Sequence, residues 1–316
     1  MVEIFKKDVE EGLSSSPKRL SSKYFYDEIG DDLFVQIMNL PEYYLTNSEY
    51  EIFQTQGLGL IQSFGFSTEN YFELVELGAG DGSKTMELLK ILLDLEYNFS
   101  YLPIDISQNA LNGLEEKLTS QLPDLDIKPR QGDYFRVLRK INASHHPKVV
   151  LFLGSNIGNM TDEQANEFIR HLSENLEEND KLVLGVDLIK SRNIVFPAYN
   201  DKTGVTREFN FNLLRRINKE LGGNFVVENY EHAPEYFEEE GIARSYLISK
   251  TDQTVTIEAL NKSFSFAKGE KMLLEVSRKY NDNIIQQIVE NTGFVISKKF
   301  VDRKNYFADY VLEKIQ

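Results

Sequence analysis

The middle of the chain shows two alternating patterns of apolar and polar positions. Short, continuous apolar runs are separated by longer segments in which apolar residues recur every three or four positions. The apolar runs are 72–77, 101–106, 148–153 and 181–188, and the amphipathic segments are 83–95, 107–122 and 161–176. Alternation of this kind predicts a parallel sheet whose crossover helices cover its faces.

The pattern changes after Ile189. A helical segment is followed by several runs with strand-like alternation, separated by breaks that contain Gly or Asn. The helical segment is 209–221, and the alternating runs are 225–237, 244–250, 253–259 and 263–280. We interpret this region as a β-rich insertion. After it, a helix at 281–293 precedes two runs, 294–302 and 306–314, which we expect to be antiparallel edge strands that complete the first sheet.

The first fifty residues read as helical and irregular chain with many aromatic side chains. At 316 residues, of which 41% are hydrophobic, the chain can bury two cores. We therefore expect an α/β protein of two domains. One is a Rossmann-like sheet domain from 53–189 and 281–316, and the other is an α+β domain formed by 1–52 and 190–280.

Charge and composition narrow the possible partners. The formal net charge is -15, and no stretch gathers the Lys and Arg patch that nucleic-acid binding needs. No apolar run approaches the ~20 residues that span a bilayer, and the N-terminus lacks the apolar core of a signal peptide. Cysteine is absent, which removes thiolate nucleophiles and thiolate metal sites. We expect a cytoplasmic monomer with neither a nucleic-acid nor a membrane partner.

Three glycines stand between the strand predicted at 72–77 and the helix that follows it. In the stretch LVELGAGDGSKT these are Gly78, Gly80 and Gly82. Glycines let a backbone approach a ligand closely, and a helix N-terminus offers unpaired N–H groups. A tight strand-to-helix turn without a ligand would carry the same residues, so the glycines alone leave both interpretations open.

Acidic residues sharpen the case for a ligand. Glu76, Asp105 and Asp133 each lie at or just after a predicted strand end, where the carboxyl ends of parallel strands converge on a ligand crevice. Asp105 can accept both hydroxyls of a ribose, and Asp133 can accept an adenine amino hydrogen while Tyr134 covers the ring. Singly, each acid would also fit a solvated loop. The three together favour a nucleoside site.

The spacing of the glycines indicates which nucleoside. It is G-x-G-x-G rather than the G-x-G-x-x-G of nicotinamide enzymes, and it resembles the S-adenosylmethionine loop of class I methyltransferases. Without a pyrophosphate, that cofactor needs fewer N–H groups and more room for its zwitterionic amino acid. Lys84, in the first helical turn, is positioned to reach the cofactor's carboxylate; the alternative is a surface lysine.

Other kinds of catalytic centre find little support. The four histidines lack the spacing of a zinc site, and no H-E-x-x-H motif is present. They are His145, His146, His171 and His232. Ser155 is not a nucleophile elbow, because G-x-S-x-G is missing around it. We expect no metal.

At this point the chain resembles the histidine-specific Nα-methyltransferase family, which includes the ergothioneine-pathway enzyme that makes hercynine. The resemblance extends over nearly the full length and rests on six motifs. They are KYFYDEIGDDLFVQIMNLPEYYLTNSEYEI, LVELGAGDGSKT, YLPIDIS, LFLGSNIGNMT, AYNDKTGVTREFNFNLL and LLEVSRKY. It implies a class I methyltransferase domain, and a substrate domain assembled from the N-terminus and the β-rich insertion.

The resemblance also implies substrate contacts. Asn159 in GSNIGN and Tyr199 in AYND match residues that bind the substrate's carboxylate, and Gly154 lies beside its α-amino group. Asn159 has a simpler alternative, because Asn often caps a helix and one is predicted to begin near residue 161. Tyr199 has one too, as a partly exposed loop residue.

The remaining implied contacts concern the imidazole and the amine. Glu275 and Ser277 in LLEVS match the pair that hydrogen-bonds the ring, and Tyr43 matches a further ring contact. Tyr26 lies near the amine, which makes it the residue expected to orient the reacting nitrogen, and Phe34 lines the same pocket.

These aromatic residues would also fit ordinary core packing. Glu275 is different, because a carboxylate on the core face of the apolar strand MLLEV is costly without a partner.

One position departs from the family. Where histidine enzymes carry a methionine in an E-M-R-L-like strand, the sequence has Ser245 in RSYL, and this residue enlarges the side-chain pocket or makes it more polar. This departure leaves the strictness of histidine specificity open.

The turn in LFLGSNIGNM contains no charged residue. A carboxylate there would stabilise the substrate's ammonium form and oppose attack by the amine, so a neutral turn suits an amino-acid substrate that must react as the free amine.

We expect S-adenosylmethionine-dependent Nα-methylation of free L-histidine, repeated until the trimethylated betaine is formed. Two alternatives remain at this stage. One is an N-methyltransferase for another aromatic amino acid or a related amine, and the other is a ligand-binding protein that retains the fold without catalysis.

Overall fold

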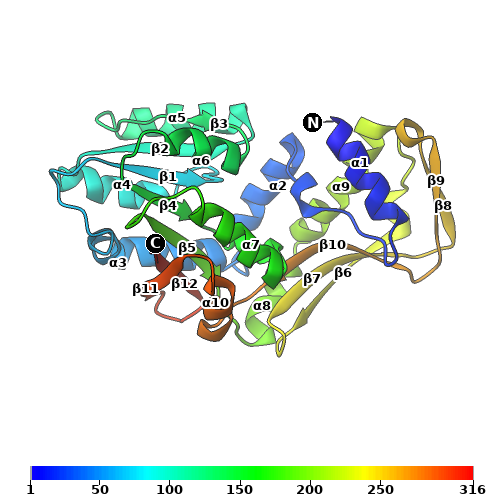
Figure 1. Cartoon of the computed structure of the whole chain (residues 1–316). Coiled ribbons are helices and arrows are strands. Elements are labelled where there is room, and N and C mark those ends of the chain that lie inside the picture. The colour runs from blue at the N-terminus through cyan, green and yellow to red at the C-terminus, as the bar shows by residue number, and fades with distance from the viewer. Residues whose placement is uncertain (1, 316) are drawn as a thin grey trace. The chain divides into compact units, whose positions relative to one another are not determined.

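The computed structural model describes residues 2–315, and the chain divides into two compact units. Unit 1 comprises Met1–Tyr44 and Lys190–Arg278. Unit 2 comprises Leu45–Ile189 and Lys279–Gln316. Figure 1 shows this interleaving by colour, because the blue N-terminal helices belong to the same unit as the yellow and orange insertion. Each unit is therefore assembled from two separate stretches of sequence.

Unit 2 is built on one seven-stranded sheet. Its strands are β1 (Phe72–Leu77), β2 (Phe99–Asp105), β3 (Arg130–Gln131), β4 (Lys148–Phe152), β5 (Lys181–Asp187), β11 (Phe294–Val301) and β12 (Phe307–Lys314). They lie in the order β11-β12-β5-β4-β1-β2-β3 (Figure 1), and the first five strands in the chain are parallel. The predicted parallel sheet with crossover helices is confirmed.

The two C-terminal runs join this sheet in antiparallel orientation, as expected. β12 pairs with β5 on one side and with β11 on the other. Of these two strands, β11 therefore lies at an edge of the sheet and β12 does not. β12 is buried along most of its length, with its first six residues all buried, which explains why its sequence is more continuously apolar than an edge strand requires.

Helices cover both faces of the sheet and enclose two separate apolar cores. The six helices are α3 (Leu45–Gln62), α4 (Thr85–Asp94), α5 (Gln108–Gln121), α6 (Tyr134–Asn142), α7 (Asp162–Ser173) and α10 (Asp282–Val289). Leucines and other apolar residues of α3, α4 and α5 belong to one core, and those of α6, α7 and α10 belong to the other. The strand order changes direction between β1 and β4. In open α/β sheets, ligands bind beyond the carboxyl ends of strands at such a point.

The boundary expected at residue 52 is wrong. It falls inside α3, a single helix of 18 residues. Ile52 and Phe53 are fully buried in a core of unit 2, so the helix cannot be divided there. The polar stretch TNSE that opens α3 resembles a loop in sequence, which conceals the true start of the helix at Leu45.

Unit 1 contains the predicted β-rich insertion together with the N-terminal helices. Its helices are α1 (Val2–Ser14), α2 (Glu28–Met38), α8 (Arg192–Tyr199) and α9 (Val205–Leu221). Its strands are β6 (Tyr230–Phe237), β7 (Ile242–Ser249), β8 (Gln253–Ile257), β9 (Lys262–Phe266) and β10 (Lys271–Arg278). They form a three-stranded sheet, β10-β7-β6, and a separate hairpin of β8 and β9.

The run at 263–280 therefore contains two strands rather than one, because the turn at Gly269, where φ is 85°, interrupts it. None of the helices within residues 2–315 is long and apolar enough to cross a membrane.

Candidate functional site

The glycine loop follows β1 and has the backbone that its sequence predicts. Gly78, Gly80 and Gly82 have φ angles of 72°, 55° and 66°, a region that favours glycine. A Cβ at Gly78 would lie 2.8 Å from the hydroxyl of Tyr134, and one at Gly82 would lie 2.3 Å from Leu114 of α5. No heavy atom of the described chain lies within 4 Å of a Cβ placed at Gly80. Gly82 thus serves helix packing, whereas Gly80 leaves the loop backbone open to a ligand.

Glu76 lies at the end of β1, buried beneath this loop. Its two carboxylate oxygens accept hydrogen bonds from the Thr85 hydroxyl, at 2.8 Å, and from the Tyr101 hydroxyl, at 2.5 Å. Desolvation raises the pKa of Glu76 to about 7, against the lowering effect of these two donors. The carboxylate therefore fixes the first turn of α4 to the loop, in addition to any contact with a ligand.

Tyr134, at the start of α6, brings the predicted nucleoside residues together. Desolvation raises its pKa to about 12, and the carboxylates of Asp105, Asp133 and Glu76 add to the shift. Three acids from separate elements, β1, β2 and the start of α6, thus affect the ionisation of one phenol. Asp105 accepts a hydrogen bond from the Ser107 N–H at 2.8 Å, and desolvation raises its pKa.

Asp133 has a structural role as well, because it is the N-cap of α6 and accepts the N–H of Arg136 at 3.1 Å. These residues fit an adenosyl cofactor. An open glycine turn, carboxylates at the ends of neighbouring parallel strands and an aromatic ring over the loop supply the donor, acceptor and stacking groups that a nucleoside needs.

The turn after β4 is held in place by Ser155. Its backbone is left-handed, with a φ of 59°, and its N–H donates to the Gly185 carbonyl at 3.1 Å. The Ser155 hydroxyl accepts the N–H of Asp187 at 3.0 Å. Ser155 therefore links the turn to β5 through both its backbone and its side chain.

Asn159 ends a short 3-10 helix in this turn, and its side chain is exposed. The helix-cap alternative for Asn159 is wrong, because α7 is capped by Thr161. The Thr161 hydroxyl accepts the Gln164 N–H at 3.3 Å, and the Gln164 side chain accepts the Thr161 N–H at 3.0 Å. Asn159 is thus available for a ligand.

The sequence did not single out Asn156. Its side-chain amide nitrogen lies 3.9 Å from the Cβ position of Gly78 and 3.8 Å from that of Gly154. This places the amide between the glycine loop and the turn after β4. The signal for it was present, since Asn156 stands in the same GSNIGN motif as Asn159.

A second missed residue, Glu49 of α3, lies buried against the same turn. Its carboxylate forms an ion pair with Lys84 and accepts the N–H of Gly154 at 2.9 and 3.1 Å. The side chain of Lys84 is 22% exposed and that of Glu49 is 0% exposed. Lys84 is therefore not a surface lysine. The turn is uncharged in its own sequence, as described, but a buried ion pair from two other elements lies directly against it.

Aromatic side chains gather in unit 1 around the segment that precedes and begins α2. Tyr26 contacts Phe34 edge-on with ring centroids 5.4 Å apart, and Phe34 contacts Tyr43 at 6.3 Å. Phe209 of α9 lies 5.6 Å from Tyr26 and 5.9 Å from Phe34. The three aromatic residues that the family resemblance implies thus form one cluster with a fourth ring, Phe209, that the sequence did not identify.

Polar groups of the three-stranded sheet complete the arrangement in unit 1. Ser245, which is 0% exposed, donates its hydroxyl hydrogen to Glu275 at 3.1 Å. The Tyr199 hydroxyl donates to Ser277 at 2.8 Å. Glu275 therefore has the polar partner that a carboxylate on this strand requires, and Ser245 supplies it. Because Ser245 and Glu275 are paired across β7 and β10, they project to the same face of the sheet.

Tyr26 lies within reach of these polar groups. Desolvation raises the pKa of its phenol, and Glu275, Asp31 and Tyr199 raise it further. Packing joins the two groups of residues, because Tyr43 of the aromatic cluster packs against the apolar cluster that contains Tyr199, whose hydroxyl bonds Ser277 of the sheet. The Tyr26 phenol remains a neutral hydroxyl at physiological pH.

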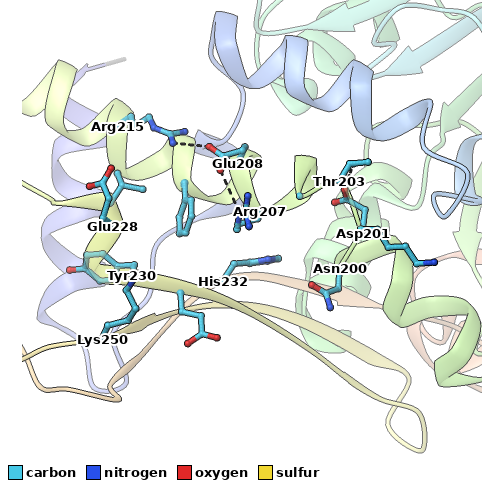
Figure 2. Close-up of a pocket in the computed structure, with 15 residues that line it drawn as sticks. Asn200, Asp201, Thr203, Arg207, Glu208, Arg215, Glu228, Tyr230, His232 and Lys250 are labelled. Carbon is cyan, nitrogen blue, oxygen red and sulfur yellow. Dashed lines mark hydrogen bonds and ion pairs between the residues drawn. The ribbon is translucent and has the colours of Figure 1, made fainter.

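Figure 2 shows a separate pocket of about 720 Å³ in unit 1. Its wall begins at Asn200, directly after Tyr199, and continues along α9 and β6. It contains none of the residues assigned to cofactor or substrate. Desolvation lowers the pKa of His232 in its wall to about 4, so this imidazole is neutral at physiological pH. Basic and acidic side chains line the pocket in equal numbers, and its charge therefore favours no class of ligand.

Within residues 2–315, no group of three or more His, Asp or Glu side chains is arranged to hold a metal ion.

Comparison with known proteins agrees with the geometry of both units. A family model described as histidine-specific methyltransferase, SAM-dependent, matches residues 5–314. A histidine N-alpha-methyltransferase of Mycolicibacterium smegmatis is 37% identical over 91% of this chain and 88% of its own length. The protein of the same name from Mycobacterium tuberculosis is 34% identical over 89% of this chain and 85% of its own length.

Ergothioneine biosynthesis protein 1 of Schizosaccharomyces pombe is 29% identical over 96% of this chain, which corresponds to 40% of that longer protein. The family match covers almost every residue, including all the motifs described above. The chain belongs to the SAM-dependent, histidine-specific methyltransferase family.

Proposed function

We propose that this protein transfers methyl groups from S-adenosylmethionine to the α-amino nitrogen of free L-histidine, and repeats the transfer until the trimethylated betaine hercynine is formed. Family membership over residues 5–314 supports the class of reaction. The observation that carries the choice of substrate is Glu275, an acceptor for a ring N–H placed beside an aromatic cluster in unit 1.

In unit 2, the cofactor residues bind different parts of S-adenosylmethionine. Asp105 accepts the ribose hydroxyls, Asp133 and Tyr134 hold the adenine, and Lys84 pairs with the methionyl carboxylate. The backbone of Gly78 and Gly80 allows the close approach. S-adenosylmethionine supplies an electrophilic sulfonium methyl group. The chain's own residues contribute positioning, which can supply roughly 7–11 kcal/mol of rate enhancement for well-oriented reactants.

The substrate residues hold the amino acid by both ends. Glu275 and Ser277 of unit 1 bind the imidazole, with Tyr43 against the ring. In unit 1, Tyr199 is assigned to the substrate's carboxylate. In unit 2, taken by itself, Asn159 is also assigned to the carboxylate, and Gly154 is assigned to the surroundings of the amine. The groups assigned to the carboxylate end are neutral, and the Glu49 carboxylate that bonds the Gly154 N–H is already paired with Lys84. The amine is therefore not trapped as an ion pair.

Tyr26 orients the attacking nitrogen rather than deprotonating it. An α-amino group with a pKa of about 8 or above must lose a proton before it can attack. The raised pKa of Tyr26 keeps its phenol protonated, so it cannot act as a phenolate base at physiological pH. Its hydroxyl oxygen instead accepts a hydrogen bond from an N–H of the amine, which leaves the lone pair free to attack, and solvent takes the proton.

Replacing Tyr26 with Phe is expected to change the extent of methylation more than the affinity for histidine. The ring, its packing on Phe34 and its attraction for a methylated cation are kept, while the hydrogen bond that aims the lone pair is lost. We expect mono- and dimethylated intermediates to accumulate. Mass spectrometry of the products checks this, and a product distribution identical to that of the wild type would remove Tyr26 from this role.

Replacing Asn159 with Ala is expected to weaken histidine binding by about 10-fold while leaving cofactor binding within twofold of the wild type, because one hydrogen bond to a charged carboxylate is lost. Asn159 does not cap α7, so the fold should be unaffected. Calorimetry with each ligand separately measures both affinities. Asn175→Ala on the C-terminal side of α7, where the amide only bonds the His171 carbonyl, is the control.

Calorimetry in the presence of S-adenosylhomocysteine tests the proposed substrate. Histidine, tryptophan and tyrosine are titrated separately into the loaded protein. Tightest binding of histidine is expected. Tighter binding of tryptophan would favour the alternative of another aromatic amino acid, for which Ser245 in place of methionine makes room. Binding of no amino acid would overturn the proposal.

A further inference from the structure

Glu49 and Lys84 form a buried ion pair, and the Glu49 carboxylate also accepts the N–H of Gly154. Glu49 comes from α3, Lys84 caps the N-terminus of α4, and Gly154 follows β4. The Lys84 ammonium nitrogen lies 3.4 Å from the Cβ position of Gly154. The Glu49 carboxylate therefore connects the start of α4, at Lys84, to the turn after β4, at Gly154.

Asp309 of β12 lies beside this pair. It is 0% exposed, and neither of its carboxyl oxygens has a hydrogen-bond partner in the described chain. Desolvation raises its pKa well above the ordinary value, and the charge of Glu49 adds to the rise. The charge of Lys84 opposes this rise. Asp309 is therefore a buried acid next to the pair, whereas Glu49 is the acid that contacts the Lys84 ammonium directly.

Gly185 of β5 makes room for both acids. A Cβ on Gly185 would lie 2.2 Å from Oε1 of Glu49 and 3.0 Å from Oδ1 of Asp309. The two carboxyl groups are therefore close neighbours over the same point of the sheet. This explains why a glycine stands inside the otherwise apolar strand LVLGVD.

We propose that Glu49 is a positioning residue of the cofactor site, whose carboxylate holds the Lys84 ammonium and the Gly154 amide in the places that cofactor and substrate require. This inference rests on the proposed function, because it takes Lys84 as the partner of the cofactor's carboxylate. An ammonium group has three N–H donors. With one directed to Glu49, two remain for the ligand.

Asp309 can serve as a reserve counter-ion for Lys84. For this reason, loss of Glu49 should move the Lys84 side chain rather than unfold the protein. Without Glu49, the Lys84 ammonium stabilises the ionised form of Asp309, which then becomes its counter-ion. The buried charge stays balanced. Lys84 is drawn toward β12, however, and in Glu49→Gln the Gly154 N–H keeps only a neutral amide oxygen as its acceptor.

The first test measures ligand affinity in Glu49→Gln by calorimetry. S-adenosylhomocysteine should bind about 10- to 100-fold more weakly than to the wild type, as expected when a charged contact is displaced by about 1 Å. Methylthioadenosine, which keeps the nucleoside but has no carboxylate, should bind within twofold of the wild type. Equal weakening of both ligands, or of neither, would overturn the proposal.

Glu51→Gln is the matched control. Glu51 lies two residues further along α3, where it contacts the side chain of Arg303 at 3.3 Å and is 30% exposed. The Glu51→Gln substitution removes the same charge from the same helix without affecting the partner of Lys84. Both ligands should bind to the Glu51→Gln variant with affinities within twofold of the wild type.

The second test measures the coupling between the two acids through thermal unfolding. Glu49→Gln and Asp309→Asn each leave Lys84 with one adjacent acid, so each should unfold near the wild-type temperature. The double variant leaves the ammonium without either acid and should unfold lower than the sum of the single shifts by roughly 6–20 °C. Additive shifts would contradict the assigned role of Asp309 as reserve counter-ion.

These measurements separate the inference from the proposed function. If the wild type binds S-adenosylhomocysteine but methylates no histidine, the proposed substrate is wrong and the role of Glu49 is still decided by ligand affinity. If the wild type methylates histidine while Glu49→Gln binds both ligands normally, only the inference fails. A wild type that does not bind S-adenosylhomocysteine would overturn both.

Discussion

Replacing Glu275 with Gln is expected to lower kcat/KM for histidine by about 10- to 100-fold, because a hydrogen bond to a charged acceptor is worth about 1.5–3 kcal/mol. Glutamine keeps the shape, and its amide oxygen can still accept the hydroxyl hydrogen of Ser245. What is lost is the negative charge that we propose to face the ring N–H of the substrate. Steady-state kinetics at saturating S-adenosylmethionine measures the effect.

The control for this variant comes from another strand of the same sheet. Glu235→Gln removes an acid from β6 that pairs with the exposed Lys271, and kcat/KM should stay within twofold of the wild type. Affinity for S-adenosylhomocysteine should be unchanged in both variants. A Glu275→Gln enzyme with wild-type kcat/KM would show that the carboxylate does not select the substrate.

Replacing Lys279 with Met is expected to lower the free energy of unfolding by about 3–5 kcal/mol, the cost of leaving a buried charge without its partner. Lys279 and Asp187 form an ion pair at 2.8 Å with both side chains 0% exposed. Backbone hydrogen bonds of 2.8 Å join the same strand end, from Tyr280 N–H to Asp187 and from Ile189 N–H to Tyr280. The pair therefore joins the end of β5 to the segment that follows β10. These are the points at which the chain passes from unit 2 into the insertion and back again.

Urea unfolding followed by circular dichroism measures this loss. Lys299→Met, which removes an equivalent lysine paired with the exposed Asp282, should cost less than about 1 kcal/mol. Adding Asp187→Asn to Lys279→Met should recover part of the loss, because it removes the uncompensated charge. If the two lysine variants were equally stable, the buried pair would have no special role.

Much of the fold follows from local pattern. The runs at 72–77, 148–153 and 181–188 become β1, β4 and β5 almost to the residue, because burial on both faces of a parallel sheet demands continuous apolar sequence. The boundary in α3 was missed for the opposite reason. Its opening turn is polar in sequence, and only packing in three dimensions shows that it belongs to unit 2.

Some site residues could likewise be predicted from local sequence, whereas others are shown only by packing in three dimensions. Glycines and acids at strand ends could be found because the loop after a strand is short and its chemistry is local. Glu49 could not, since its partners Lys84 and Gly154 lie 35 and 105 residues away in the sequence. A buried acid on a helix looks like any other helical glutamate until its neighbours are known. Asp309 is hidden in the same way within an apolar strand.

We propose that this chain methylates the α-amino group of histidine. The most direct measurement is to incubate the purified protein with L-histidine and S-adenosylmethionine and to follow the products by tandem mass spectrometry. We predict successive mono-, di- and trimethylated histidine, with every methyl group on the α-nitrogen and the trimethylated form accumulating at the end. Absence of methylated histidine, or methyl groups on the imidazole ring, would contradict the account.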